Sequence, residues 1–103
     1  MDKQKLIEKI RLDSNKTIEY NPHSELKITV RKIPKELIDD HLRNHEPTLI
    51  EEQEYEEEKR YKLYYEYDKT KDLIVVISFS SEGLKIITSF YQYKLRRLKN
   101  EPS

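Results

Sequence analysis

A histidine, a lysine and an arginine follow one another at intervals of four residues: His23, Lys27 and Arg31. Residues four apart lie on one face of a helix, so in a helix these side chains would line one edge. An imidazole, which exchanges protons near neutral pH, together with two cations suits contact with an anion, above all a phosphate backbone. A solvated polar face on an ordinary amphipathic helix is the simpler alternative.

The element that carries these residues is ambiguous. Asn21 followed by Pro22 is typical of a helix start, with asparagine as the N-cap and proline at the first helical position. Leu26, Ile28 and Val30, however, alternate with polar residues, which predicts a strand. The start signal favours a helix and the alternation favours a strand.

Helices are expected in the first part of the chain. Apolar residues at helical spacing predict a surface helix around residues 6–10 that stops near 13–15. A further helix is expected to open at Pro34 and to be ended by Pro47, because a residue before proline avoids the helical region.

The second half predicts a sheet. Alternation over residues 60–67 predicts a half-buried strand, with the acidic run before it as a short edge strand and a solvated hairpin loop. The run 73–79 is apolar on both faces, so it should be the central strand. Gly83, the single glycine, is expected in the turn before a last strand, residues 84–93. The predicted fold class is α+β: two or three N-terminal helices followed by a three- to four-stranded antiparallel sheet.

The composition narrows the functional classes. With 103 residues, the chain is expected to be a single domain, with its core in about 6–98 and a basic tail in 94–103. The formal net charge is zero, but two poles underlie it. The acidic pole comprises seven glutamates: Glu46, Glu51, Glu52, Glu54, Glu56, Glu57 and Glu58. The basic pole comprises five side chains: Lys85, Lys94, Arg96, Arg97 and Lys99.

Several classes are excluded or disfavoured. The chain has no cysteine, which excludes thiol catalysis, disulfides and cysteine metal clusters. A single glycine cannot form a phosphate-binding loop, so no nucleotide cofactor is expected. No apolar run is long enough to span a membrane, and the polar N-terminus does not resemble a signal peptide, so we expect a cytoplasmic chain. Usage rich in Lys, Glu, Tyr and Ile is typical of proteins from hot environments.

Two weaker signals concern histidines and tyrosines. His41 and His45 have a metal-binding spacing, but without an accompanying carboxylate motif we expect no metal ligand role. Tyr61, Tyr65 and Tyr67 alternate as core residues do. The remaining candidates for a base-stacking surface are Tyr64, Tyr91 and Tyr93.

Short motifs over residues 18–52 resemble a known family. His23-Ser24 is similar to its His-Ala, Lys27-Ile28 to its Arg-Met, and Arg31-Lys32-Ile33 to its Arg-x-Ile. Residues 87–91 and 94–97 resemble its last strand and basic tail. The family is a domain-of-unknown-function family grouped with the RelE-like toxins, and the resemblance covers about residues 6–98. The chain departs from the family pattern at Pro34, Gln92, Tyr93 and Leu98.

The resemblance implies a fold and a chemistry. It implies two or three helices before a twisted antiparallel sheet, and it favours a helix over residues 23–31. It also implies relatives that cleave RNA as toxins held in check by an antitoxin. Metal-free RNA cleavage needs a base, a cation for the developing charge and an acid. The catalytic candidates are His23, Lys27, Arg31 and Tyr91, and the nucleic-acid-binding candidates are Lys94, Arg96 and Arg97.

Each of these residues also has a purely structural alternative. His23 could cap its helix locally, Arg31 could form a salt bridge with the acidic run, and the basic tail could be a solvated chain end. The resemblance, together with the basic segments, leads us to expect an RNA-binding protein; the resemblance further implies the toxin of a toxin–antitoxin pair and, most specifically, an mRNA endoribonuclease. Its expected partners are RNA, a small antitoxin protein and, as a further option, a second copy of the chain. The alternative is a catalytically silent module that binds a protein through a sheet edge.

Overall fold

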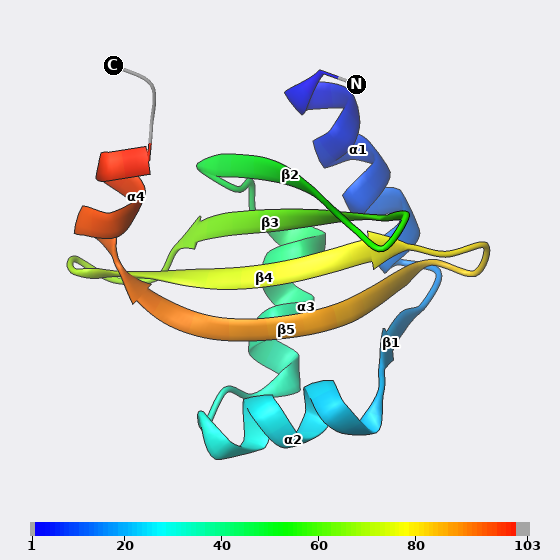
Figure 1. Cartoon of the computed structure of the whole chain (residues 1–103), viewed down its shortest axis with the longest axis horizontal. Helices are drawn as coiled ribbons and strands as arrows, with labels where there is room; N and C mark the ends of the chain where they lie inside the picture. Colours follow the sequence, from blue (N-terminus) through cyan, green and yellow to red (C-terminus); the bar gives the residue numbers. More distant parts are fainter. Residues whose placement is uncertain (1, 101–103) are drawn as a thin grey trace.

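The computed structural model describes residues 2–100, with side chains up to Leu98. Three helices come first, then most of the sheet, then a short helix (Figure 1). The elements are α1 (Lys3–Ser14), β1 (Ile18–Tyr20), α2 (Pro22–Val30), α3 (Lys35–Asn44), β2 (Leu49–Tyr55), β3 (Glu58–Glu66), β4 (Lys71–Phe79), β5 (Leu84–Tyr93) and α4 (Lys94–Asn100). The predicted α+β class is confirmed.

The sheet differs from the prediction in strand number and direction. It has five strands in the order β1-β5-β4-β3-β2, and β1 runs parallel to β5, so it is mixed rather than purely antiparallel. The strand that was not predicted is β1. It is only three residues long and shows no clear alternation of apolar and polar residues, which is why the sequence pattern did not reveal it. The apolar run that was expected at the centre forms β4, in the middle of the five strands.

The three N-terminal helices lie on one side of the sheet. In Figure 1, α3 crosses behind β4 and β5, and α2 lies alongside β5 below it. The main core joins these helices to the side chains of β3, β4 and β5 that point towards them; its fully buried members include Ile10, Ile28, Leu42, Leu63 and Val75. Burial of this face is the largest favourable contribution to folding, since it removes apolar surface from water.

The opposite face of the sheet has its own smaller cluster. Tyr64, Ile74 and Val76 are buried there, and Phe90 and Ile87 are half-buried against them. Of the described helices, α4 alone reaches over this face, at one end, where its Arg97 pairs with Asp72 of β4. We call this side of the sheet the helix-free face, because α1, α2 and α3 all lie on the other side.

The start of α2 resolves the ambiguity over residues 21–31 in favour of the helix. The Asn21 side chain accepts a hydrogen bond of 2.8 Å from the Ser24 backbone, and the Ser24 hydroxyl accepts one of 3.0 Å from the Asn21 backbone. This reciprocal cap, with Pro22 in the first turn, stabilises the helix end by about 1 kcal/mol and outweighs the alternating pattern.

The edge strand and hairpin expected for the acidic run are confirmed: residues 51–55 belong to β2, an edge strand, and a two-residue turn with positive φ at Glu56 and Glu57 leads into β3. Two local expectations are wrong. Tyr64, expected at the surface, is fully buried on the helix-free face, whereas Tyr67, expected in the core, is 46% exposed. The burial of each of these tyrosines depends on where β3 ends and on which faces of the sheet are covered. The alternation of apolar and polar residues contains neither piece of information.

No helix within the described residues 2–100 is long and apolar enough to cross a membrane.

Gly83, in the turn before β5, packs against the backbone of Thr17 just before β1. Its φ is +155°, and a Cβ at this position would lie 2.3 Å from the Thr17 carbonyl oxygen. The next residue, Leu84, donates a backbone hydrogen bond of 2.9 Å to the same oxygen. The close approach therefore fixes the parallel pairing of β1 with β5, and through β1 the position of α2.

Replacing this glycine should be costly. We predict that Gly83→Ala lowers the free energy of unfolding by about 2 kcal/mol or more, because both the backbone conformation and the contact with Thr17 oppose a side chain. Urea unfolding measures the change. Ser81→Ala, at an exposed position of the same turn, is the control and should change stability by less than about 0.5 kcal/mol. Equal effects of the two substitutions would contradict the packing described for Gly83.

Candidate nucleic-acid interface

The ring of Phe90 lies among three cations on the helix-free face. The Arg31 guanidinium carbon is 5.6 Å from the ring centroid, and the Lys62 ammonium is 5.8 Å from it. Lys62 also lies 5.0 Å from the centroid of the Tyr64 ring beneath it. Arg96 of α4 lines the same pocket as Phe90. We call Arg31, Lys62, Phe90 and Arg96 the Phe90 cluster.

Arg31 reaches this face because of its place at the end of α2. It is the C-cap residue of the helix, and its Nη1 donates to the Thr88 hydroxyl at 2.9 Å and to the Ser89 carbonyl oxygen at 2.8 Å. β1 pairs with Leu84–Ile86, so among residues 2–100 the rest of this edge of β5 has no strand beside it. Arg31 thus donates to the Ser89 carbonyl oxygen, a backbone acceptor at the sheet edge that has no neighbouring strand to bond it within the described chain.

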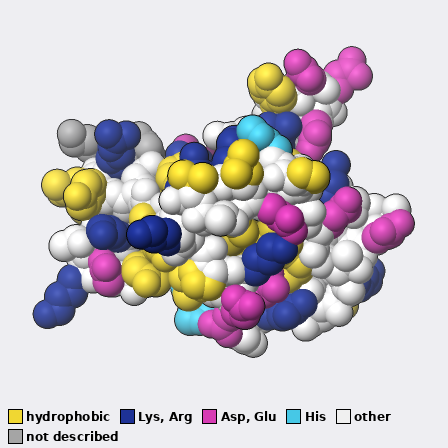
Figure 2. Space-filling view, turned by 90° about the horizontal axis from the view of Figure 1, so that it is seen from below, with side chains coloured by type: hydrophobic (Ala, Val, Ile, Leu, Met, Phe, Trp, Pro, Cys, Tyr) yellow, Lys and Arg dark blue, Asp and Glu magenta, His cyan; other side chains and the backbone are white. Residues whose placement is uncertain are grey.

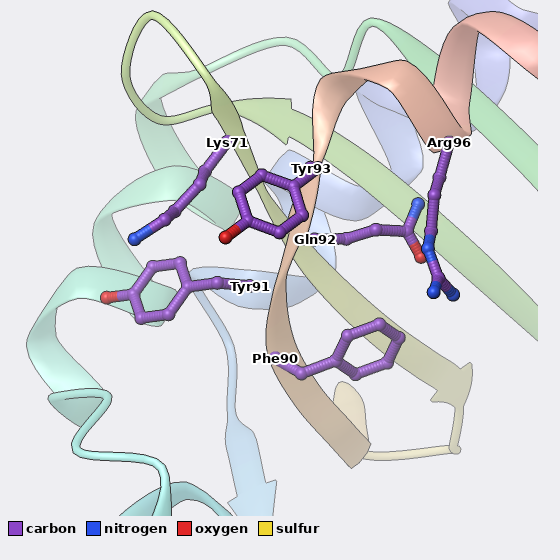
Figure 3. Close-up of a pocket in the computed structure, with 6 residues that line it drawn as sticks. All are labelled: Lys71, Phe90, Tyr91, Gln92, Tyr93 and Arg96. Carbon is purple, nitrogen blue, oxygen red and sulfur yellow. The ribbon is translucent and has the colours of Figure 1, made fainter.

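A shallow pocket of about 410 Å³ opens at this edge of β5. Figure 3 shows Phe90, Gln92 and Arg96 on one side of the β5 ribbon, and Tyr91, Tyr93 and Lys71 on the other. The pocket therefore wraps around the exposed edge rather than entering the core. Aromatic rings and cations together make up most of its lining.

The carboxylates of the helix-free face are already engaged. Glu66 lies 3.9 Å from the Lys94 ammonium, Glu58 lies 3.8 Å from Arg60, and the Tyr64 hydroxyl donates to Glu51. Within the part of the chain that the structure describes, none of the three cations of the Phe90 cluster has an ion-pair partner. Their charge is therefore available to an anionic ligand.

Most of the acidic run lies away from the Phe90 ring, but Glu51 is paired directly opposite Lys62, where it accepts the hydrogen bond of the Tyr64 hydroxyl. β2 is the opposite edge strand, three strand spacings from β5, which corresponds to about 14 Å. Lys59 also neutralises Glu52, at 2.8 Å. Within the described residues, Arg31 makes no salt bridge to the acidic run, as one alternative had supposed.

The predicted catalytic residues do not converge on one point. His23 lies at the other end of α2, about 12 Å along the helix axis from Arg31, and it is exposed. Lys27 lies between them on the same edge, half-buried. Helical spacing correctly placed the three side chains along one edge of α2, and of the three Arg31 is the one whose side chain hydrogen-bonds the sheet in the described residues.

Tyr91 points to the other side of β5 from Phe90 (Figure 3). Its ring packs against that of Tyr67, with 4.8 Å between centroids. Partial burial, together with a hydrogen bond to Tyr67, raises the pKa of Tyr91 to about 12. Its hydroxyl is therefore protonated at neutral pH and can donate a hydrogen bond, but it does not share a surface with Arg31.

The three basic residues predicted in the tail have different surroundings. Arg97 is 6% exposed; its Nε donates to Asp72 at 2.7 Å, and its Nη2 lies 3.7 Å from Glu66. Lys94 shares Glu66 with it. Arg96 is exposed and lines the Phe90 pocket. Of the three, Arg96 is the side chain placed to meet a ligand, and Arg97 is placed to hold α4 on the sheet.

The outward face of α2 is apolar rather than basic. Leu26 is 63% exposed and Val30 is 71% exposed. Figure 2 views the molecule from below, the side on which α2 lies, and hydrophobic side chains appear there among charged side chains of both signs. This side therefore differs in character from the Phe90 cluster.

The sequence reasoning missed Phe90 and Lys62. Lys62 pairs with Val76 and Val76 pairs with Thr88, so the contact of Lys62 with Phe90 crosses three strands. A bulge between Val76 and Ile77 also shifts the register of β5 against β4. Alternation within single strands contains no signal for such a contact.

Comparisons with family models, with curated proteins and with solved structures give no match for this chain.

The different roles of Arg96 and Arg97 can be tested by stability. We predict that Arg97→Met lowers the free energy of unfolding by about 3–5 kcal/mol, because the fully buried carboxylate of Asp72 loses its partner. Arg96→Met, the matched control one residue earlier, should change it by less than about 0.5 kcal/mol. Chemical unfolding measures both. Adding Asp72→Asn to Arg97→Met should recover part of the loss; if it does not, the ion pair is not what makes Arg97 important.

Proposed function

We propose that this chain binds single-stranded RNA on the helix-free face of its sheet, with Phe90 as the central contact. The observation that carries the proposal is the position of one accessible aromatic ring among three cations that come from α2, β3 and α4 and have no carboxylate partner within the described residues. Rings that stack on bases, combined with cations that follow the backbone, are the usual means of binding single strands.

Each side chain has a defined part in the proposal. A base stacks on the exposed side of Phe90, an interaction worth about 1–3 kcal/mol. Arg31 hydrogen-bonds the sheet through Nη1, so that Nε and Nη2 remain for a phosphate, which suits the two-pronged geometry of guanidinium. Lys62 contributes a point charge beside the ring. Because Tyr64 is fully buried beneath Lys62, it supports the surface and does not stack on a base.

The proposal concerns binding. A RelE-like fold, activity as a toxin, and an antitoxin partner stay predictions from the resemblance of residues 18–52. What supports a relation to the RelE-like family is only a general arrangement: the three N-terminal helices lie on one side of the sheet, and the basic residues of the Phe90 cluster lie on the other. The distance between His23 and Arg31 does not support a catalytic pair, so we do not propose His23 as the base of a cleavage reaction.

A second candidate function is binding of a protein strand at the edge of β5. Within the described residues, the edge of residues 87–93 that faces away from β4 has no strand beside it, and beyond Ser89, whose carbonyl oxygen accepts from Arg31, such an edge can accept another chain. The other edge, β2, carries Glu51, Glu52 and Glu54, whose charges oppose strand addition. Val30 and Tyr93, both largely exposed, supply apolar surface on α2 and at the end of β5.

Fluorescence anisotropy with a labelled single-stranded RNA of about ten nucleotides tests the first candidate. Phe90→Leu should weaken binding about tenfold, since leucine fills the apolar site but cannot stack. Phe79→Leu, the same change in the only other phenylalanine, should leave binding unchanged, because that ring packs on the helix side against Tyr61.

Charge provides a second matched pair within the same experiment. Lys62→Gln should weaken binding and reduce the slope of log affinity against log salt by about one. Lys5→Gln, on the exposed surface of α1, should change neither. Equal losses in Phe79→Leu and Phe90→Leu, or affinity that ignores salt, would reject the RNA interface. Two results together would favour the edge-binding candidate: the chain does not bind RNA, and it forms dimers in gel filtration that the substitution Tyr93→Ser disrupts.

A further inference from the structure

Two histidines and an aspartate meet at the C-terminal end of α3. The ligand atoms that Asp40, His41 and His45 offer all lie within 4.8 Å of one another. The sequence reasoning set the two histidines aside because no carboxylate motif accompanied them. The structure supplies the carboxylate from Asp40, whose Oδ2 lies 3.1 Å from Nε2 of His45.

The tautomer of His41 is determined by its hydrogen bond. Nδ1 lies 2.8 Å from the Leu37 carbonyl oxygen, which can only accept, so Nδ1 carries the proton. In the neutral ring, the lone pair is then on Nε2. This arrangement, with one ring nitrogen bonded to a backbone carbonyl and the other left with a lone pair, is how metal-ligating histidines are usually oriented. His41 is 5% exposed, so its ring is also held by packing against Tyr65.

The other two donors are accessible and adjustable. The backbone of His45 is extended at the C-cap of α3, and its ring stacks on that of His41 with 4.3 Å between centroids and 19° between planes. The Asn44 side chain donates to Oδ1 of Asp40 at 2.7 Å, which orients the carboxylate and leaves Oδ2 towards His45. The Asp40 and His45 side chains are each about half exposed, at 51% and 49%.

We propose that Asp40, His41 and His45 form a binding site for a divalent transition-metal ion, with Zn²⁺ as the reference ion. Two imidazoles and one carboxylate are a donor set that suits zinc, with a solvent-facing fourth position for water. Zinc ligands at about 2.1 Å place neighbouring donors about 3.4 Å apart, so binding requires the half-exposed Asp40 side chain to move closer and the half-exposed His45 ring to turn out of its stack on His41.

The position of the site favours a cation and suggests its effect. The C-terminal end of a helix carries partial negative charge, and α3 is long enough for this field to matter at its last turn. His45 is the last residue before the segment that leads through Pro47 into β2. A bound ion would therefore attach this segment to the last turn of α3 and stabilise the folded chain.

Titration of the full chain with Zn²⁺ against a competing chelator tests the proposal. We expect one ion per chain with a dissociation constant in the micromolar range or below, and a higher melting temperature in the presence of Zn²⁺. His45→Gln and Asp40→Asn, both at exposed positions, should each weaken binding at least about tenfold and remove the thermal shift. His23→Gln, which replaces the one histidine outside the site, is the matched control and should leave both the affinity for Zn²⁺ and the thermal shift unchanged.

A ring-specific measurement protects the test from effects on folding. In ¹⁵N NMR of the unmodified chain, Zn²⁺ should shift Nε2 of His41 while its Nδ1 remains protonated. The proposal is overturned if all three variants bind Zn²⁺ as the parent chain does, if the loss follows His23→Gln, or if the parent chain binds only at millimolar concentrations.

Discussion

The central strand needs cover on both of its faces, and the three N-terminal helices cover only one. Leu73, Ile74, Val75 and Ile77 of β4 are fully buried although they point alternately to opposite sides of the sheet. On one side α1, α2 and α3 close the core. On the other, the cover comes from Tyr64, Phe90, the long side chain of Lys62 and, at one end, α4. The basic and aromatic character of this face is therefore first a consequence of packing.

The same packing makes the face suitable for an anionic ligand. Lysine and arginine can bury their aliphatic stems over rings while their charged heads remain in water. Contacts of a cation with a ring face are worth about 0.5–1 kcal/mol at exposed sites, too little to hold the cation against a phosphate. A bound RNA would meet cations that the fold has already positioned, which lowers the entropic cost of binding. Glu52, Glu58 and Glu66 are engaged in ion pairs, and Glu51, which lies opposite Lys62, accepts a hydrogen bond from Tyr64.

The sequence predicted those features that depend on neighbours along the chain. The start of α2 follows from Asn21 and Pro22, the turn at Gly83 from the only glycine, and the central position of β4 from a continuous apolar run. Features that depend on distant partners were missed. β1 is too short for a pattern and exists because Thr17 and Gly83 meet. α4 was read as a basic tail, and its Arg97 is held by Asp72, a residue 25 positions earlier.

The candidate sites show the same division. Spacing of four correctly predicted a common edge for His23, Lys27 and Arg31, but that edge extends over the whole helix, and Arg31 at its end is the residue that hydrogen-bonds β5 in the described structure. Phe90 and Lys62 come together through the register of three strands, and Asp40 meets His45 because the chain turns at the end of α3. A residue pattern identifies which side chains share a face, whereas the packing decides which of them share a site.

Mapping the contact surface by NMR tests the central claim most directly. On titration of the labelled chain with single-stranded RNA, the account predicts that the largest shifts fall on the Phe90 ring, the Lys62 ammonium and the Arg31 guanidinium, with His23 unaffected. Shifts centred on α1 and α3, or shifts at His23 without any at Phe90, would contradict it.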